Sequence, residues 1–478
     1  MEKLKLSFIS ALTLLILLVS CKQEDIPTIA VENEVNTFIW SALNSWYYWQ
    51  SDVSNLRDDR FDSKNKLNTF LNGYTDPNLL FEDLKYPDDR FSWIVDDYQT
   101  LDQYFAGVTT SFGFKYGLVR WSQDSVLGYV KYVVPESPAS EVGLKRGDLF
   151  YAVNGQNMML DNYSELLKDQ EGYQLSLAKI ENSLLTPTEI SEAFFAIELT
   201  ENPILLTKII EIEGTKIGYL MYNGFKHTFH KELNEAFGTL KEAGIDELVL
   251  DLRYNSGGSI YTSMHLASMI YGDADASNVF CKIVYNDAHG GNSRALNFVD
   301  NVDVVNSEFE SQYTLQLNEL AIDRMYVLVS SQTASASELI IAGLLPYMEV
   351  ILIGNQTVGK NEASRTLYDS PSSDFTDNEK DLNPNHTWAV QPIISKLANS
   401  QDFSDYSTGF IPDIEARESD YLEFMKPLGD DSELLLSLAI DEITGRNALG
   451  RQSFKDPKTI VSELTNKFAF EMHLNGIY

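Results

Sequence analysis

Residues 324–344, RMYVLVSSQTASASELIIAGL, predict a strand, a tight turn and a helix in immediate succession. MYVLVS is a short apolar run rich in β-branched residues, SQT is a turn, and ELIIAGL is an apolar helical segment. Ser335 and Glu338 have the spacing of a capping box, so the stretch alone also fits an ordinary capped helix. A serine at such a corner can instead present its hydroxyl at the mouth of the sheet, beside helix N–H groups that stabilise an oxyanion.

Strands and helices alternate around this corner. The strands are KIGYLMYN, ELVLDL, RMYVLVS and VILIG, and helices are expected from Lys231 to Ala243, from Ser259 to Ile270 and from Ala336 onward. Strands that are apolar on both faces and separated by helices predict an α/β domain, here assigned to residues 201–478. Ligands of such domains bind at the carboxyl ends of the strands, which is where the candidate residues fall.

A nucleophilic serine needs a base, because its hydroxyl is almost entirely protonated at neutral pH. None of the six histidines forms an obvious His/Asp pair near the helix. Lys360 follows the strand VILIG in the segment NQTVGK, and Gly359 before it allows a tight turn. If Lys360 is buried beside Ser335, loss of solvation favours its neutral amine. Considered alone, Lys360 is better explained as an exposed loop lysine.

The stretch DLRYNSGGS, residues 251–259, supplies the third element of a candidate site. Its paired glycines let the backbone adopt positive φ and approach a substrate closely. Gly258, with or without Gly257, can join the N–H of Ala336 in stabilising a tetrahedral oxyanion. A Gly-Gly turn considered alone is structural.

Residues 101–200 change to short strands with glycine-containing turns, for example SFGFKYG (111–117) and LGYVKYVVPESPASEVGLKRGDLFYAVNGQ (127–156). A short helix is expected from Ser137 to Val142. This region resembles a PDZ domain. The resemblance implies that the amides of Phe112, Gly113 and Phe114 bind a terminal carboxylate beside a strand edge. A β-domain without a ligand role is the alternative.

The amino-terminal part of the chain predicts export, followed by a helical domain. Residues 1–20 have the layout of a signal peptide, and Leu18-Val19-Ser20-Cys21 resembles a bacterial lipobox in which Cys21 is lipidated. A plain signal peptide with a chance cysteine is the alternative. Residues 21–31 are expected to be a tether, and residues 32–100 a small helical domain.

The composition excludes some classes of partner. The formal charge is −34, with 70 acidic and 36 basic residues spread along the chain, so there is no basic stripe for nucleic acid. Cys281 is the only cysteine besides Cys21, so we expect no disulfide in the mature protein. No other stretch approaches twenty apolar residues, so membrane attachment is expected through the lipid anchor only.

Together these motifs resemble the carboxy-terminal processing, or tail-specific, serine peptidases. The match runs from about residue 100 to residue 417 and includes LVLDLRYNSGG, TASASELIIAGLL, LIGNQTVGK and GFIPDIEA. The resemblance implies a multidomain α/β (α+β) fold: a crotonase-like peptidase domain, an inserted PDZ domain and the helical amino-terminal domain. It places a Ser/Lys dyad on Ser335 and Lys360, and the oxyanion amides on Gly258 and Ala336. Many relatives have a glutamine four residues after the lysine, where this chain has Ser364.

We therefore expect an exported, lipid-anchored serine endopeptidase of the bacterial cell envelope, on the periplasmic or the surface face of the outer membrane. Its partners are peptide or protein substrates, recognised through carboxyl-terminal tails by the PDZ domain, and it needs no metal or cofactor. The oligomeric state stays open. The alternative is a non-catalytic peptide-binding lipoprotein on a peptidase scaffold, which Ser364 favours. Within the corner, we expect Glu338 and Ser337 to serve the helix and Ser335 to face Lys360.

Overall fold

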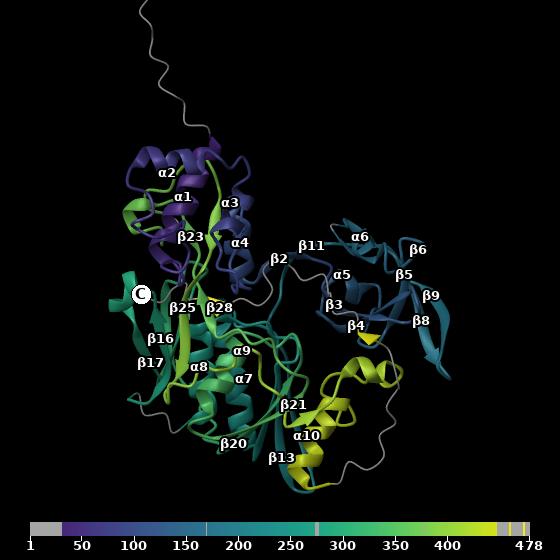
Figure 1. Cartoon of the computed structure of the whole chain (residues 1–478). Coiled ribbons are helices and arrows are strands. Elements are labelled where there is room, and N and C mark those ends of the chain that lie inside the picture. The colour runs from purple at the N-terminus through teal and green to yellow at the C-terminus, as the bar shows by residue number, and fades with distance from the viewer. Residues whose placement is uncertain are drawn as a thin grey trace, which may run out of the picture.

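The computed structural model describes residues 31–168, 170–272, 277–377, 379–446, 458–459 and 472–473. Figure 1 shows amino-terminal helices in purple, a β-domain in blue to one side, and a central α/β domain in teal and green. Cys21 lies outside the described residues, so its lipidation stays a prediction. Within the described ranges, no helix combines the length and apolar character needed to cross a membrane.

Three helices form the amino-terminal region: α1 (Val31–Trp46), α2 (Lys64–Leu71) and α3 (Pro77–Leu84). The apolar side chains of α1 recur at helical spacing, so they line one buried face, namely Val35, Phe38, Ile39, Ala42 and Leu43. This face belongs to the same hydrophobic cluster as the helices of the central domain. The amino-terminal helices therefore share the central core instead of enclosing one of their own.

The β-domain is built on a sheet with the strand order β27-β3-β4-β5-β8-β9. Its short helix α5 (Pro138–Glu141) begins after Ser137, which caps it, and Gly143 follows its end with φ of 79°, as the sequence predicted. The elements of this domain are β2 (Val108–Ser111), β3 (Phe114–Arg120), β4 (Val126–Val133), β5 (Leu149–Val153), β6 (Gln156–Asn157), α6 (Tyr163–Leu167), β7 (Gly172–Tyr173), β8 (Leu175–Glu181), β9 (Leu184–Ile190), β10 (Phe194–Phe195) and β11 (Ile197–Thr200), with β27 (Lys458–Thr459) added from the end of the chain.

The central domain contains a six-stranded sheet with the order β12-β13-β14-β20-β21-β26. Its strands are parallel except for the hairpin partner β12. Leu248 and Leu250 face one hydrophobic cluster and Val249 faces another, so this sheet is buried on both faces, as predicted. The strands are β12 (Ile204–Ile212), β13 (Thr215–Tyr222), β14 (Glu247–Asp251), β20 (Arg324–Val329), β21 (Glu349–Gly354) and β26 (Ile414–Glu415).

Helices cover both faces of this sheet (Figure 1). One face packs against α7 (His230–Ala243), α8 (Ile260–Tyr271) and α9 (Ala336–Leu344), and the other against α10 (Leu434–Thr444). A second sheet, β15-β28-β22-β25-β16-β17, packs into the same cluster as α7 to α9. Its strands are β15 (Gly258–Ser259), β28 (Met472–His473), β22 (Glu362–Ser364), β25 (Ile393–Asn399), β16 (Val279–Tyr285) and β17 (Arg294–Asn297).

Smaller elements join the amino-terminal region to the central domain. β1 (Trp93–Val95) pairs antiparallel with β24 (Ala389–Gln391), which also pairs with β23 (Leu367–Tyr368). The helix α4 (Tyr98–Ala106) follows β1, and the hairpin of β18 (Asn301–Val305) and β19 (Ser311–Gln316) packs against α7 of the central domain. The segment after α3 is therefore tied directly to the part of the chain that follows β22.

Candidate active site

Ser335 occupies the corner between β20 and α9. It is the N-cap residue of α9 and has φ of 65° and ψ of −119°, a region that non-glycine residues rarely occupy. Such a conformation costs on the order of 1–3 kcal/mol and persists only where the surroundings impose it. The Oγ atom is buried and makes no hydrogen bond to any described residue, Lys360 included. The corner thus holds a strained serine whose hydroxyl has no structural partner.

Glu338 fixes the backbone on both sides of the site. Its carboxylate accepts the N–H of Ser335 at 2.8 Å, the N–H of Gly359 at 2.7 Å, the N–H of Lys360 at 2.8 Å and the hydroxyl of Thr357 at 2.6 Å. Burial raises the pKa of Glu338, and these four hydrogen bonds oppose that rise. Of the two hydrogen bonds of the predicted capping box, the structure has the one from the Ser335 N–H to the Glu338 carboxylate. The Ser335 hydroxyl does not accept the other bond from the helix backbone.

The Gly-Gly loop lies against the serine corner. The hydroxyl of Ser337 donates to the carbonyl of Asn255 at 3.0 Å, and the N–H of Ala334 donates to the same carbonyl at 3.2 Å. The expectation that Ser337 serves the helix is therefore wrong, because its hydroxyl bonds across to the loop. Gly258 has φ of 137°, and a Cβ there would lie 2.4 Å from the carbonyl oxygen of Phe225. Only glycine fits this position.

Lys360 is fully buried two residues before β22, so it is not the exposed loop lysine of the alternative interpretation. Its Nζ lies 5.1 Å from the centroid of the Phe91 ring, within the range of a cation–π contact. Arg90 donates to the carbonyl of Gly359 at 2.6 Å and to that of Ser407 at 2.9 Å. An arm of the amino-terminal region therefore supports the lysine loop. Sequence analysis assigned no role to this arm.

Ser364 accepts a hydrogen bond from Gln391, with 3.0 Å between Nε2 and Oγ. Gln391 is fully buried on β24, and its Oε1 makes no hydrogen bond within the described part of the chain. A glutamine amide thus reaches the position of Ser364 from another strand. Sequence analysis missed Gln391, because nothing in its local sequence links it to a residue 27 positions earlier.

The strand β28 lies between β15, which begins at Gly258, and β22, which follows Lys360. Met472 pairs with Gly258, and His473 pairs with both Ser259 and Ser364, all in parallel orientation. Because neighbouring strands are about 4.8 Å apart, β15 and β22 are separated by the width of one extended chain. We call this space the β15–β22 gap.

A buried ionic network lies at the other end of the Gly-Gly loop. Arg253 is fully buried and binds Asp251 at 2.8 Å, Glu433 at 2.6 Å and Glu418 at 2.9 Å. Arg146 of the β-domain also binds Glu418 and Glu433. Burial alone raises the pKa of Glu418, but the two guanidinium groups lower it to about 2. The network therefore joins the β-domain to the loop that carries Gly258.

In the candidate carboxylate-binding loop of the β-domain, one of the three backbone N–H groups already has a hydrogen-bond partner within the loop. Gly113 has φ of 76°, and its N–H donates to Oγ of Ser111 at 3.0 Å. Phe112 and Phe114 pack against Tyr173, with centroid distances of 4.2 and 6.2 Å. At the other end of β3, Lys458 and Thr459 of β27 pair antiparallel with Arg120 and Val119. The edge of β3 therefore accepts an added strand.

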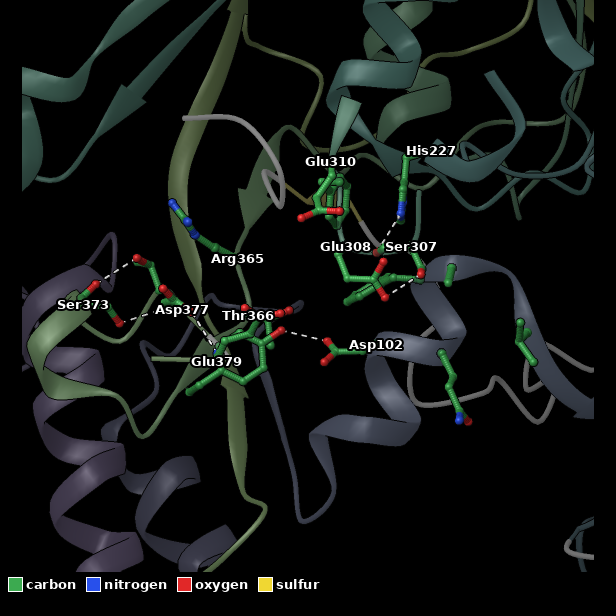
Figure 2. A pocket seen from close by; sticks show the side chains of 17 residues that line it. Asp102, His227, Ser307, Glu308, Glu310, Arg365, Thr366, Ser373, Asp377 and Glu379 are labelled. Atoms are coloured by element: carbon green, nitrogen blue, oxygen red, sulfur yellow. Dashed lines mark hydrogen bonds between the residues drawn. The ribbon is translucent and has the colours of Figure 1, made fainter. Parts of the chain in front are cut away.

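A cavity of about 790 Å³ opens beside β22, between α4, the β18–β19 hairpin and the loop after β23 (Figure 2). Arg365 and Thr366, which follow Ser364 directly, line it. The described residues contain no group of three or more His, Cys, Asp or Glu side chains placed to hold a metal ion. Cys281 is buried, which raises the pKa of its thiol to about 12.

Comparison with known proteins assigns this architecture to a family. The sequence pattern of peptidase family S41 matches residues 216–414, which include Ser335, Lys360 and Gly258. This part of the chain is a peptidase S41 domain. Residues 34–93 match the S41 N-terminal domain and residues 129–178 match a PDZ domain, so the predicted family resemblance and fold class are confirmed, while the lipoprotein form stays a prediction. S41 peptidases are serine peptidases, which confirms the predicted enzyme class.

Individual relatives agree with this assignment. The carboxyl-terminal-processing protease of Synechocystis sp. is 24% identical over 334 residues, which cover 69% of this chain and 68% of the relative. CtpA of Bacillus subtilis is 26% identical over 224 residues, which cover 47% of this chain and 42% of that protein. The crystal structure of a putative S41 protease from Bacteroides fragilis is 27% identical, has a TM-score of 0.66, and is matched over 86% of this chain and 97% of its own.

Proposed function

We propose that this S41 peptidase is an endopeptidase that cleaves peptide or protein chains through an acyl-enzyme on Ser335, with Lys360 as the general base. The observation that carries the proposal is the Glu338 carboxylate, which binds the backbone N–H groups of Ser335 and Lys360 at 2.8 Å each. One rigid acceptor thereby fixes both residues of the dyad. The buried Ser335 hydroxyl has no competing partner among the described residues. Dyad hydrogen bonds that are open without substrate commonly tighten when substrate binds.

The reaction follows from these positions. The neutral amine of Lys360 takes the proton of the Ser335 hydroxyl as Oγ attacks the substrate carbonyl carbon. The N–H groups of Gly258 and Ala336 stabilise the resulting oxyanion. The tetrahedral intermediate collapses, the peptide C–N bond breaks, and the Lys360 ammonium returns its proton to the leaving amine. Water, deprotonated by Lys360, then hydrolyses the ester and releases Ser335.

Ser364 and Gln391 act together as the group that orients the Lys360 amine. Many relatives use one glutamine at the position of Ser364 for this purpose. Here the buried amide of Gln391 holds Ser364 at 3.0 Å, and its own carbonyl oxygen has no partner among the described residues. The pair therefore places both a hydroxyl and an amide at β22, which follows Lys360, and this argues against loss of catalysis through the exchange at position 364.

The PDZ domain captures carboxyl-terminal tails of substrates. The pairing of β27 with β3 supports strand addition at this edge, and the loop of Phe112, Gly113 and Phe114 supplies amides for the terminal carboxylate. Binding of a tail requires the Gly113 N–H to exchange its bond to Ser111 for one to the ligand. Lipidation at Cys21 anchors the protein in the cell envelope, with the outer membrane as the proposed location.

Cleavage of an unfolded protein substrate tests the dyad. Ser335→Ala and Lys360→Ala each abolish turnover, whereas Ser437→Ala, on α10 and away from the site, leaves it unchanged. Amidation of the substrate's carboxyl terminus lowers kcat/KM if the PDZ domain captures tails. Turnover that survives Ser335→Ala refutes the nucleophile, and absence of turnover in the unsubstituted chain favours the non-catalytic scaffold.

A further inference from the structure

The acidic cavity beside β22 continues the β15–β22 gap. Arg365 and Thr366, which follow β22, form part of the cavity wall. His227 also lines the cavity, and it comes two residues after Phe225, which forms a β-bridge with Gly258. The strand β28 shows the direction of an extended chain in the gap, because it runs parallel to β22 and its His473 is level with Ser364. A peptide that takes the place of β28 and runs in this direction puts its following residues beside Arg365 and Thr366, at the cavity.

Carboxylates line the cavity from two sides, as Figure 2 shows: Glu308 and Glu310 from the hairpin, Asp377 and Glu379 from the loop opposite. In the part of the chain that the structure describes, none of these four forms an ion pair with a lysine or arginine. Their neighbours are neutral donors, for example Ser307 at 2.7 Å from Glu308 and Asn306 at 2.8 Å from Glu310. Like charges around one cavity create a negative potential that attracts a cation.

The positive side chain in the wall does not neutralise this potential. Figure 2 shows the guanidinium of Arg365 directed away from Glu308, and it lies 5.8 Å from the ring of Trp46. His227 does not contribute a charge at neutral pH, because burial, with a smaller contribution from nearby His230, lowers its pKa to about 3. The cavity therefore keeps its negative charge.

His227 adds an unused acceptor to the same cavity. It is 1% exposed, and its Nε2 lies 3.3 Å from the carbonyl oxygen of Ser307. A carbonyl oxygen only accepts, so Nε2 carries the proton of the neutral ring and Nδ1 is an acceptor. Nδ1 is buried without a hydrogen-bond partner among the described residues. A cationic ligand that donates hydrogen bonds pairs with the carboxylates, and the neutral His227 ring does not oppose it.

We infer that the cavity is a subsite for a lysine or arginine side chain of a peptide bound in the β15–β22 gap. The inference rests on the proposed peptidase function and specifies its substrate class. A metal ion is not the ligand, because the carboxylates are too dispersed to form a group of three in the described structure. A terminal carboxylate is repelled here, so tail capture by the PDZ domain and side-chain recognition in this cavity use different surfaces.

Peptide binding to the full-length Ser335→Ala chain tests the subsite without turnover. The probes are fluorescent peptides with amidated carboxyl termini. Each series places Lys, Gln or Glu at one chosen position, and different series place it at different positions along the peptide. Amidation removes the PDZ contribution. We expect one or more positions at which Lys binds at least about 10-fold tighter than Glu, with a preference that weakens as ionic strength rises from 50 to 500 mM.

Substitutions in the cavity give the second measurement. Both double variants are made in the Ser335→Ala background. Glu308→Gln combined with Glu379→Gln should reduce the preference for Lys over Glu peptides to about 2-fold or less. The control, Glu189→Gln combined with Glu192→Gln on the exposed surface of the PDZ domain, should leave this preference unchanged. Circular dichroism checks that each variant is folded. If the cavity double variant does not fold, the salt dependence of the preference for Lys over Glu peptides, measured on the Ser335→Ala chain, tests the inference. Equal binding of Lys and Glu peptides at every position, or a preference that survives the cavity substitutions, overturns the inference. Loss of turnover in the separate cleavage assay instead refutes the proposed function.

Discussion

Replacing Gly258 by alanine tests the oxyanion loop most directly. Its φ of 137° is unfavourable for alanine, and the new Cβ would lie 2.4 Å from the Phe225 carbonyl oxygen and 3.0 Å from its carbon. Both atoms belong to backbone, so the loop must move, and the 258 N–H moves with it. Strain costs about 1–3 kcal/mol of stability. Loss of one oxyanion donor costs a further 3–4 kcal/mol or so in the transition state, about 100- to 1,000-fold in kcat.

Gly143→Ala is the matched control. Gly143 also has positive φ, 79°, but a Cβ there meets no atom within 4 Å and the residue lies in the PDZ domain. Urea unfolding should show a loss of about 1–2 kcal/mol for this control, while kcat changes less than 3-fold. A folded Gly258→Ala variant that keeps kcat within 3-fold of the unsubstituted enzyme contradicts the role of this loop. An equal loss of kcat in the control contradicts the local explanation.

Three further predictions concern the scaffold of the site. Glu338→Gln replaces one oxygen by an NH₂ group that faces two donors, so kcat should fall at least about 100-fold, whereas exposed Glu349→Gln should have no effect in the same assay. Arg253→Met leaves buried Asp251 without a cation, and leaves Glu418 and Glu433 with Arg146 alone. It should lower the free energy of unfolding in urea by about 3–5 kcal/mol, and a loss below 1 kcal/mol would contradict the network. Acid should destabilise the protein as pH falls below about 6.5, because burial lowers the folded-state pKa of His227, His230 and His265, so the unfolded chain binds more protons. By pH 5.5 each of these histidines should lower the free energy of unfolding in urea by about 1.4 kcal/mol. A His265→Phe variant should lose less stability over the same pH range.

The sequence predicted the parts of the site that depend on local pattern. The strand, turn and helix around Ser335 follow from the apolar run ending at Val329 and the helical run starting at Ala336, and the structure has these boundaries. Gly258 was identifiable because a Gly-Gly pair after a buried strand signals positive φ. Lys360 was found by its place after a buried strand, and its burial is confirmed.

Contacts between distant segments could not be predicted in the same way. The bond from Gln391 to Ser364 depends on the pairing of β24 and β25 with their neighbours, which no local pattern encodes. The role expected for Ser337 was wrong for a related reason: capping propensity describes a helix alone, whereas here the Asn255 carbonyl approaches from another loop and takes the hydroxyl.

The amino-terminal region supports the lysine loop of the candidate site, although its sequence suggested a separate helical domain. Asp89 accepts the N–H groups of Phe91 and Ser92 at 2.9 Å each, which fixes the arm between them. Arg90 then holds the carbonyl of Gly359, and the Phe91 ring lies beside Nζ of Lys360. Glu338 grips the same loop from the opposite side through N–H groups. The lysine is therefore positioned by two elements that meet only in the folded chain, and a peptidase domain without residues 89–92 would lack half of that support.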